Sequence, residues 1–293
     1  MKIAYVCTNY NNSAFTLAAV ESLMKNTGHD IRIYVVDNAS RPEEVDILRT
    51  LAQRVPEVRL MANADNVGYF AGLNMGIRAA REEDASVEWM VVGNNDLVFP
   101  ADICDRIEQR RAEYGDYPVV SPDVVTLDGH HQNPHVLTGI STARELIYDL
   151  YFSNYFLGRF IYRAAKAFPR ATRRGDEDHW RTARTIRQGH GSCYVLTPKF
   201  FGKFEDLWSP TFMMSEEFFL SLQLERAGEH LFYSPDISVT HYWHGSLQDV
   251  PNRRRWNIAR DAHREYRKYV KVFKNDKNDK SEKNEKNERK EKT

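Results

Sequence analysis

Three polar residues, Asn94, Asn95 and Asp96, follow directly on an apolar run. Polar groups in such a position need hydrogen-bond partners or a ligand, because burying them unpaired costs free energy. A hard cation such as Mg²⁺ or Mn²⁺ is commonly held by one carboxylate, waters and substrate phosphates. We therefore predict that Asp96 binds a divalent metal. The alternative is a β-turn, in which Asn and Asp are both frequent.

Two segments of similar composition come earlier in the chain. Residues 8–12 include Thr8 and Tyr10 and offer an aromatic face and several amides. Residues 37–40 begin with Asp37 and Asn38, a carboxylate and an amide that could hydrogen-bond a ribose or a base edge. Neither has the glycines of a dinucleotide-binding G-x-G-x-x-G turn, which disfavours that class of site. An Asn-rich turn and a helix cap are the alternatives.

A third segment, residues 66–74, combines two glycines and two asparagines at the start of a helical pattern. Asn66, Gly68 and Asn74 belong to it. Backbone N–H groups at a helix start suit a phosphate or a base carbonyl. Glycines are also common wherever a loop passes into a helix.

The second half of the chain offers two adjacent carboxylates, Glu216 and Glu217, at the start of a helical pattern. The helix dipole keeps such carboxylates ionised, and an ionised carboxylate can act as a general base. The same dipole explains acidic first turns without any catalysis. His241 ends an apolar run. Together with His244 and Asp96 it could complete an octahedral metal site, although a lone His near a strand end is usually structural.

The elements that must position these residues alternate in type along the first 99 residues. Apolar, β-rich runs at 3–7, 31–36, 58–61 and 89–92 are separated by helical patterns at 14–25, 43–53 and 71–81. This alternation predicts an α/β fold with a parallel sheet covered by helices. Ligands then bind at the carboxyl ends of the strands, where the polar segments lie.

Beyond residue 99 the order is less regular. A polar loop at 126–134 holds His130 and His131 and could form a rim of the site. The aromatic and basic stretch 145–168 predicts one amphipathic helix, which continues into the basic residues 170–174. The other predicted elements are helices at 103–113, 214–227 and 252–269 and strands at 118–121, 192–196 and 237–243. The tail from residue 274 has no apolar residue to bury, which predicts disorder.

Composition restricts the class of protein. Lys plus Arg and Asp plus Glu both number 41 in 293 residues, so no overall field favours nucleic acid, which we do not expect as a partner. The three cysteines are far apart, which argues against a disulfide framework and a zinc site and favours the cytoplasm. The first apolar run is too short for a signal peptide and is read as a strand.

Taken in order, the motifs VVDNAS, NVGYFAGLNMGI and GNNDLVF resemble glycosyltransferase family 2, and especially its rhamnosyltransferase- and galactofuranosyltransferase-like members. The resemblance covers about residues 3–250 and implies the GT-A nucleotide-diphospho-sugar transferase fold, with a central, mainly parallel sheet flanked by helices. It implies that the nucleotide contacts Thr8, Asp37, Asn66 and Gly68. We also assign to the nucleotide-sugar site the neighbouring Tyr10, Asn38, Asn94 and Asn95. Asn74 would support the loop and Asp96 would bind the metal, while Asn94 stands where many members have an acidic residue.

The resemblance extends to the second half. Residues 188–194 resemble the acceptor-side segment, which includes Gly191 and Ser192. Residues 212–220 resemble F-x-x-x-E-D-x-D-L, which aligns Glu217 with the general base and leaves Glu216 as a possible substitute. Residues 241–246 resemble H-x-x-G-x-S, which makes His241 a ligand of the metal or the diphosphate.

We therefore expect an inverting, metal-assisted transferase of polysaccharide or cell-surface glycan biosynthesis. Its donor would be a UDP-, dTDP- or GDP-sugar, its acceptor a glycan or a lipid-linked saccharide, and its cofactor Mn²⁺ or Mg²⁺. Residues 1–250 would form the catalytic domain, with a nucleotide-sugar half at 1–99 and an acceptor half at 100–250 that carries a helical insertion at about 143–185. A basic helix at 251–273 and a disordered tail at 274–293 would follow.

Other interpretations stay open. The aromatic and basic stretch 145–174 and the basic helix from residue 252 suggest peripheral contact with the cytoplasmic face of a membrane, and a homodimer is compatible with the sequence. A non-catalytic sugar- or membrane-binding module on the same fold is a second hypothesis, motivated by Asn94 and Glu217. A metallohydrolase using His130, His131, His135 and His241 is a third, but the chain lacks H-E-x-x-H or similar spacing.

Overall fold

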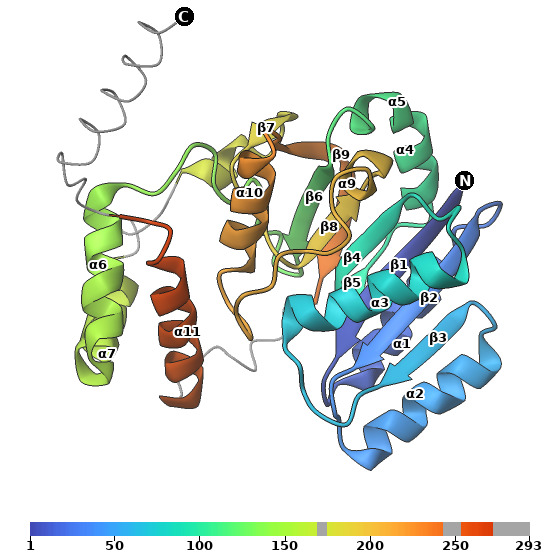
Figure 1. The fold of residues 1–293 in the computed structure, drawn as a ribbon, viewed down its shortest axis with the longest axis horizontal. Coiled ribbons are helices and arrows are strands. Elements are labelled where there is room, and N and C mark those ends of the chain that lie inside the picture. Colours follow the sequence, from blue (N-terminus) through green and yellow to red (C-terminus); the bar gives the residue numbers. More distant parts are fainter. Residues whose placement is uncertain (169–174, 243–252, 272–293) are drawn as a thin grey trace, which may run out of the picture.

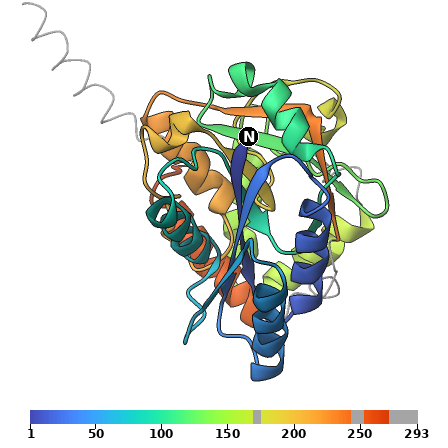
Figure 2. The same ribbon diagram turned by 90° about the vertical axis from the view of Figure 1, so that its right-hand side faces the viewer.

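The computed structural model describes residues 1–168, 175–242 and 253–271. In this part of the chain, a large mixed sheet lies between two layers of helices (Figures 1 and 2). Three predictions fall wholly or partly on residues outside it: the basic stretch 170–174, the motif after His241, and the tail from residue 274. No described helix has both the length and the apolar character that a membrane span requires.

The first part of the chain alternates strands and helices, as the periodicity predicts. Its elements are β1 (Lys2–Asn9), α1 (Ser13–Leu23), β2 (Asp30–Asp37), α2 (Pro42–Arg54), β3 (Val58–Ala62), α3 (Tyr69–Glu83), β4 (Met90–Asn94) and β5 (Leu97–Val98). Strands β1, β2 and β4 are almost fully buried apolar runs that end in polar loops, while the edge strand β3 is mostly half-buried. This is the pattern expected of parallel strands covered on both faces.

The second part has shorter and less regular elements. They are α4 (Ile103–Gln109), α5 (Arg111–Tyr114), β6 (Val119–Thr126), α6 (Thr142–Ser153), α7 (Tyr155–Ala167), the 3₁₀ helix η1 (Asp176–His179), β7 (Arg184–Ile186), β8 (Cys193–Leu196), α9 (Pro198–Phe201), α10 (Glu216–Arg226), β9 (Leu231–His241) and α11 (Arg253–Tyr266).

The strand order is β3-β2-β1-β4-β8-β6-β9-β5, with β7 paired to β9. Strands β1 to β4 are parallel, β8 runs antiparallel to both β4 and β6, and β6 is parallel to β9. The register places Thr8 beside Asn94 and Asn9 beside Asp37. The carboxyl ends of β1, β2 and β4 therefore form one edge, as predicted.

Each face of the sheet carries its own apolar core. Helices α1, α2 and α4 cover one face, and α3, α9 and α10 cover the other. Because side chains alternate along a strand, Tyr5 and Cys7 of β1 enter the first core while Ala4 and Val6 enter the second. The same alternation sends Asn9 toward α1 and Thr8 toward α3.

Several predicted boundaries are wrong, and two of them have a clear local reason. The helix predicted at 145–168 is two helices, because Asn154 is extended and its side chain caps α7 by accepting from Phe156 N at 2.8 Å. The helix at 103–113 breaks at Arg110 into α4 and α5. Helix α10 starts two residues later than predicted, because Met214 and Ser215 are both left-handed. The last strand begins at Leu231, not at residue 237.

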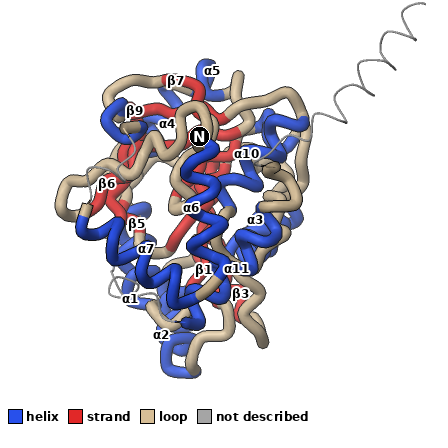
Figure 3. The backbone as a smooth tube through the Cα atoms, turned by 90° about the vertical axis from the view of Figure 1, so that its left-hand side faces the viewer, coloured by secondary structure: helices blue, strands red, loops and turns tan. Residues whose placement is uncertain are grey.

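Helices α6, α7 and α11 form a group beside the sheet (Figure 3). Arg267 lies just after α11 and joins it to α6, with its guanidinium 3.1 Å from Glu145 Oε2 and 2.6 Å from Asp149 Oδ1. His263 Nε2 lies 2.8 Å from the same Asp149 oxygen. These partly buried charges fix the C-terminal helix against the helical insertion.

Candidate active site

The strand ends at the carboxyl edge form what we call the donor rim: Thr8, Asp37, Asn38, Asn94 and Asn95. Helix α3 approaches this rim closely, since a Cβ on Gly72 would lie only 2.7 Å from Thr8 Cγ2. Thr8 and Asn94 sit on the α3 side of the sheet. Thr8 of β1 and Asn94 of β4 are paired in the sheet, and both are partly exposed at its edge. Gly72, which has no side chain, lets α3 pack against Thr8.

On the α1 side the rim residues bind one another. Asp37 is fully buried, and its carboxylate accepts from Asn9 Nδ2 at 2.8 Å and from Ser40 N at 2.9 Å. Asn95 Nδ2 donates to Asn9 Oδ1 at 3.0 Å and to Thr16 Oγ1 at 2.8 Å. Asp37 and Asn95, both predicted to bind the donor, therefore hold the loops of the rim together, while Tyr10 is half exposed.

The loop before α3 is fixed by backbone contacts. Asn38 Nδ2 donates to Gly68 O at 2.9 Å, and Asn66 Oδ1 accepts from Gly68 N at 3.0 Å. Gly68 has φ +94°, and a Cβ on it would lie 2.2 Å from Phe212 O, which accepts from Tyr69 N at 3.0 Å. Glycine is required here both for the left-handed backbone and for the close approach.

Asn74 acts as a clamp on a distant loop. Its Nδ2 donates to Leu207 O at 2.8 Å, and its Oδ1 accepts from Leu207 N at 2.9 Å. The side chain is buried and both ends are used. The resemblance implied that Asn74 supports a loop, and the loop that it holds is the one around Leu207, which leads toward α10.

Asp96 and His241 meet at the end of β4. Asp96 Oδ1 lies 3.2 Å from His241 Nε2, and His241 Nδ1 lies 2.7 Å from the acceptor Gln132 Oε1. Since Gln132 Oε1 can only accept, the Nδ1 atom carries a proton, and in the neutral ring Nε2 carries a lone pair. Asn94 Nδ2 lies 3.3 Å from the same nitrogen.

Asp96 Oδ1 is buried and accepts no hydrogen bond from the described residues. It faces the lone pair of His241 Nε2, and this contact is favourable only with a proton or a cation between the two atoms. A carboxylate and an imidazole at one point, oriented by a neighbouring amide, fit a divalent ion that completes its shell with water and phosphate oxygens. The residues present therefore fit Mn²⁺ or Mg²⁺.

Gly191 links this pair to the carboxylates of α10. Ser192 O accepts from Asn94 N at 2.8 Å, and Gly191 O accepts from the Tyr69 hydroxyl at 2.7 Å. Gly191 N donates to Glu217 Oε1 at 3.2 Å, and a Cβ on Gly191 would lie 2.7 Å from that oxygen. The predicted acceptor-side segment therefore lies between the predicted metal ligands and the predicted base.

The two carboxylates of α10 have different surroundings. Glu216 is buried and accepts from Met214 N at 2.8 Å. Burial, and then the neighbouring charge of Glu217, raises the pKa of Glu216 well above its ordinary value. Glu217 is only partly buried and lines a cavity. Of the two, Glu217 is the carboxylate that a ligand in the cavity can reach.

Three further residues belong to the site although no role was predicted for them. Gln132 lies in the polar loop 126–134 and orients the His241 ring through its Oε1 atom. In that loop the sequence drew attention to His130 and His131 instead. Tyr69 lies near three carboxylates, and burial followed by the charge of Glu216 raises its pKa well above the usual value. His190 has a pKa well below the usual value because of burial, then because of His135, and its ring centroid lies 5.9 Å from that of His241.

The histidines of the hydrolase hypothesis have separate partners. His130 Nε2 lies 3.3 Å from Glu177, while His131 Nδ1 lies 2.9 Å from Asp123 and its ring stacks on Trp180 at 3.7 Å. Within residues 1–168, 175–242 and 253–271, these histidines do not gather with acidic or cysteine side chains into a group of metal ligands.

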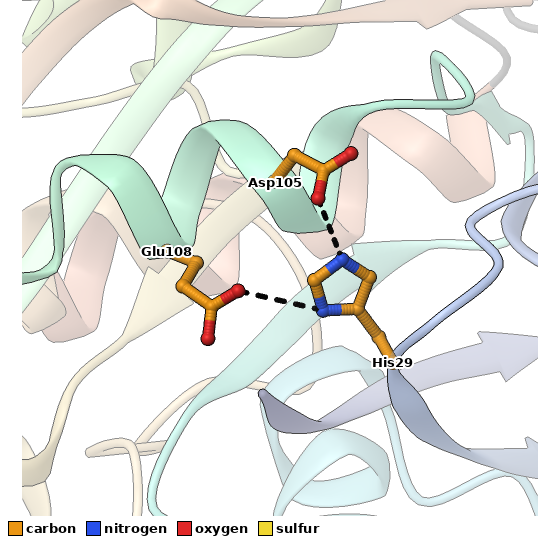
Figure 4. Close-up of side chains that lie close together, drawn as sticks. All are labelled: His29, Asp105 and Glu108. Atoms are coloured by element: carbon orange, nitrogen blue, oxygen red, sulfur yellow. Dashed lines mark hydrogen bonds and ion pairs between the residues drawn. The ribbon is translucent and has the colours of Figure 1, made fainter.

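One such group does occur in the described chain, at His29, Asp105 and Glu108 (Figure 4). It lies near the amino ends of the strands, at the edge opposite to the donor rim. The amine of Met1 already lies 3.0 Å from His29 Nδ1 and 3.3 Å from Glu108 Oε1. Positive charge is thus supplied by the protein, and the group needs no metal ion.

Comparison with known sequences supports the resemblance. The family model described as Glycosyl transferase family 2 matches residues 6–164. The succinoglycan biosynthesis protein ExoO of Rhizobium meliloti (strain 1021) is 30% identical over 128 residues, which are 43% of this chain and 35% of that protein. An uncharacterized glycosyltransferase of Nostoc sp., alr2836, is 30% identical over 83 residues, 28% of this chain and 26% of that protein. The matches thus span about a third or less of these relatives.

Solved structures of similar shape are also transferases. The mannosyltransferase PcManGT of Pyrobaculum calidifontis, in complex with GDP-Man and Mn²⁺, superposes with a TM-score of 0.51 at 14% identity, over 83% of this chain and 57% of that one. GalNAc-T7 with UDP, GalNAc and Mn²⁺ superposes with a TM-score of 0.53 at 12% identity, over 85% and 45%. At these identities the likeness shows the fold, and it confirms the predicted fold class.

Proposed function

The chain belongs to glycosyl transferase family 2, and from this premise we propose that it transfers one sugar from a nucleoside diphosphate to an acceptor hydroxyl, with inversion at the anomeric carbon. One observation carries the proposal. Asp96 Oδ1 and His241 Nε2 lie 3.2 Å apart at the carboxyl edge of the sheet. Beside this pair Ser192 O accepts from Asn94 N, and the preceding residue, Gly191, donates its N–H to the carboxylate of Glu217. A site for a leaving diphosphate and a base are thus neighbours.

The donor would bind over the rim. Thr8 and Asn66 are partly exposed, while the buried Asp37, Asn38 and Gly68 hold the loops beside them. Their internal hydrogen bonds support the proposal, since loops that are already fixed lose little conformational freedom when a nucleotide binds. UDP-, dTDP- and GDP-sugars all remain candidate donors.

Asp96 and His241 would hold the metal ion, with Asn94 beside them. A bound Mn²⁺ or Mg²⁺ would neutralise the negative charge that develops on the leaving diphosphate. Gln132 holds the His241 ring in the tautomer that turns Nε2 toward Asp96. This arrangement accounts for a buried carboxylate oxygen that otherwise lacks a hydrogen-bond donor.

Glu217 would act as the general base. Its carboxylate takes the proton of the acceptor hydroxyl while that oxygen forms a bond to the anomeric carbon. The bond from this carbon to the diphosphate oxygen breaks, and the electron pair leaves with the nucleoside diphosphate. Gly191 N holds one oxygen of Glu217, and Glu216 is kept neutral by burial, which avoids repulsion between adjacent carboxylates.

Release of nucleoside diphosphate by the purified protein tests the proposal. A panel of UDP-, dTDP- and GDP-sugars would be assayed with Mn²⁺ and with Mg²⁺, in the unchanged chain and in Asp96→Ala and Glu217→Gln. We expect turnover that requires the metal and falls sharply in both variants. Unchanged activity in both would sink the assignment. Binding of a donor without turnover on any acceptor would favour the second hypothesis, a non-catalytic module, which the neutral Asn94 favours.

We also propose that the outer face of α7 rests on the cytoplasmic surface of a membrane. Phe156, Phe160 and Phe168 are each about 70% exposed, and Arg163 and Lys166 are exposed near them. Aromatic and basic side chains together are typical of helices that lie in the headgroup region. Flotation with anionic liposomes would detect binding. The double variant Phe156→Ser/Phe160→Ser should lose it, and equal flotation of both proteins would contradict the contact.

A further inference from the structure

A cavity of about 490 Å³ opens beside Glu217, between the catalytic edge of the sheet and the helices α6, α7 and α11. Its size is within the range of small-molecule binding sites. Its near wall carries His135, Gln188 and Glu217. Glu217 contributes the one carboxylate among the described residues that line it.

The far wall is different in character. Ile147 and Phe152 of α6, Ile161 and Ala165 of α7, and Ala259 of α11 give it an apolar surface. The same helices add a smaller set of polar groups, from Arg144, Tyr148, Tyr151, Tyr162, His263 and Tyr266. The apolar part of this wall suits hydrocarbon, while its polar groups and the near wall suit hydroxyl groups.

The helices are held apart by specific contacts, so the space is a built feature of the molecule. Trp256 of α11 is buried and its Nε1 donates to Tyr151 O at 3.3 Å. Gly158 allows this, since a Cβ there would lie 2.8 Å from Trp256 Nε1. The contacts of Arg267 with Glu145 and Asp149 hold the other end of α6.

We propose that this cavity, the acceptor cavity, binds the hydrocarbon part of an amphiphilic acceptor, whose sugar hydroxyl then lies at Glu217. The acceptor is thus a glycolipid or lipid-linked saccharide, not a free glycan. The inference rests on the proposed function, because it gives the second substrate of the same site its chemical class. The apolar outer face of α7, beside the same wall, leads from the cavity toward a lipid surface.

Paired glycosides test the inference. Octyl and methyl glycosides of glucose, galactose, mannose and rhamnose would be compared as acceptors below the micelle concentration, with the donor found in the panel. Burial of about two methylene groups lowers KM roughly tenfold, so we expect at least this preference for octyl chains. In Ile161→Gln the preference should disappear, and in the control Ile47→Gln, on the exposed face of α2, it should persist. Ala259→Met places a larger side chain in the cavity and should also abolish the preference for octyl chains.

Calorimetry separates this inference from the proposed function. If octyl glycosides bind more tightly than methyl glycosides, and Ile161→Gln or Ala259→Met removes the difference, the cavity binds hydrocarbon even where no sugar is transferred. Sugar transfer with equal KM for both chain lengths would overturn the inference and leave the transferase intact. A preference for octyl chains that survives both cavity variants would also overturn it.

Discussion

At the donor rim nearly every polar side chain has a partner within the protein, whereas the acceptor cavity is walled by helices that present aliphatic and aromatic side chains together with a few polar ones. The rim is built from the ends of adjacent strands, and its contacts are short hydrogen bonds such as Asn95 to Asn9. The cavity is built from helices that are far apart in the chain and meet through a few contacts, such as Trp256 with Tyr151. On the proposed function, a fixed rim would favour one nucleotide, while a wall of separate helices could change its acceptor by substitution of side chains alone.

The largest effect is expected for Glu217→Gln, because Glu217 lies at the boundary between the donor rim and the acceptor cavity. Removal of a general base lowers kcat by about 10²–10⁴-fold, while KM for the donor should stay the same, because the rim is untouched. Steady-state kinetics of nucleoside diphosphate release would measure both. Glu225→Gln, at the other end of α10, is the control and should behave like the unchanged chain. An equally large loss in Glu216→Gln with activity retained in Glu217→Gln would assign the base to the other carboxylate.

Gln132→Leu tests the rim side. Without the acceptor Oε1, the His241 ring loses the bond that fixes its tautomer, and affinity for Mn²⁺ should fall about 10–100-fold. Calorimetric titration of the protein with MnCl₂ measures this directly. Gln53→Leu on the exposed face of α2 provides the comparison. Equal Mn²⁺ affinity in both variants would show that Gln132 plays no part in holding the metal ligand.

Gly158→Ala tests the cavity side. The added Cβ would lie 2.6 Å from Tyr151 O, so α7 must shift, and overpacking of this kind costs about 1–3 kcal/mol of unfolding free energy. Denaturant unfolding measures the loss. Gly202→Ala, whose Cβ would meet nothing nearer than 3.5 Å, should cost less. Because the rim is independent of α7, donor affinity should be unchanged; a parallel loss of donor affinity would show that the two regions are coupled.

The last prediction concerns pH and Glu216. Its pKa is raised in the folded protein from an ordinary value near 4.5, so the folded state holds this proton more tightly than the unfolded chain does. The stabilisation is complete below that ordinary value and is lost as the pH rises through the folded pKa. Each tenfold difference in proton affinity corresponds to about 1.4 kcal/mol, or roughly 3 °C in Tm. Glu216→Gln cannot ionise, so its Tm relative to the unchanged chain should increase as the pH rises above about 4.5. Parallel Tm curves would contradict the raised pKa.

The sequence was sufficient to predict the first half of the fold. Buried parallel strands appear as apolar runs bounded by polar loops, and the carboxyl-edge rule placed Thr8, Asp37 and Asn94 together. It could not show which of them face inward. Asn95 turns away from Asp96 and His241 because of the local turn after β4, and nothing in hydrophobic periodicity encodes that turn.

The second half was less predictable, because its geometry depends on contacts between distant segments. Gln132 reaches His241 only after a loop folds back from β6, so no local motif identifies it. The left-handed Met214 and Ser215 are neither Gly nor Asn, and the sequence therefore gives no sign of where α10 begins. The aromatic stretch 145–168 predicted an amphipathic helix, but not that its inner face would enclose a cavity.

The contact of Gly68 with Phe212 joins the donor loop to the chain that leads into Glu217. If the proposed function holds, a nucleotide that contacts the Gly68 loop also contacts the backbone that leads into the proposed base, so binding at the two places is coupled. We therefore expect an ordered reaction in which the donor binds first and the nucleoside diphosphate leaves last. Product inhibition measures this order, because the nucleoside diphosphate should then compete with the donor and not with the acceptor.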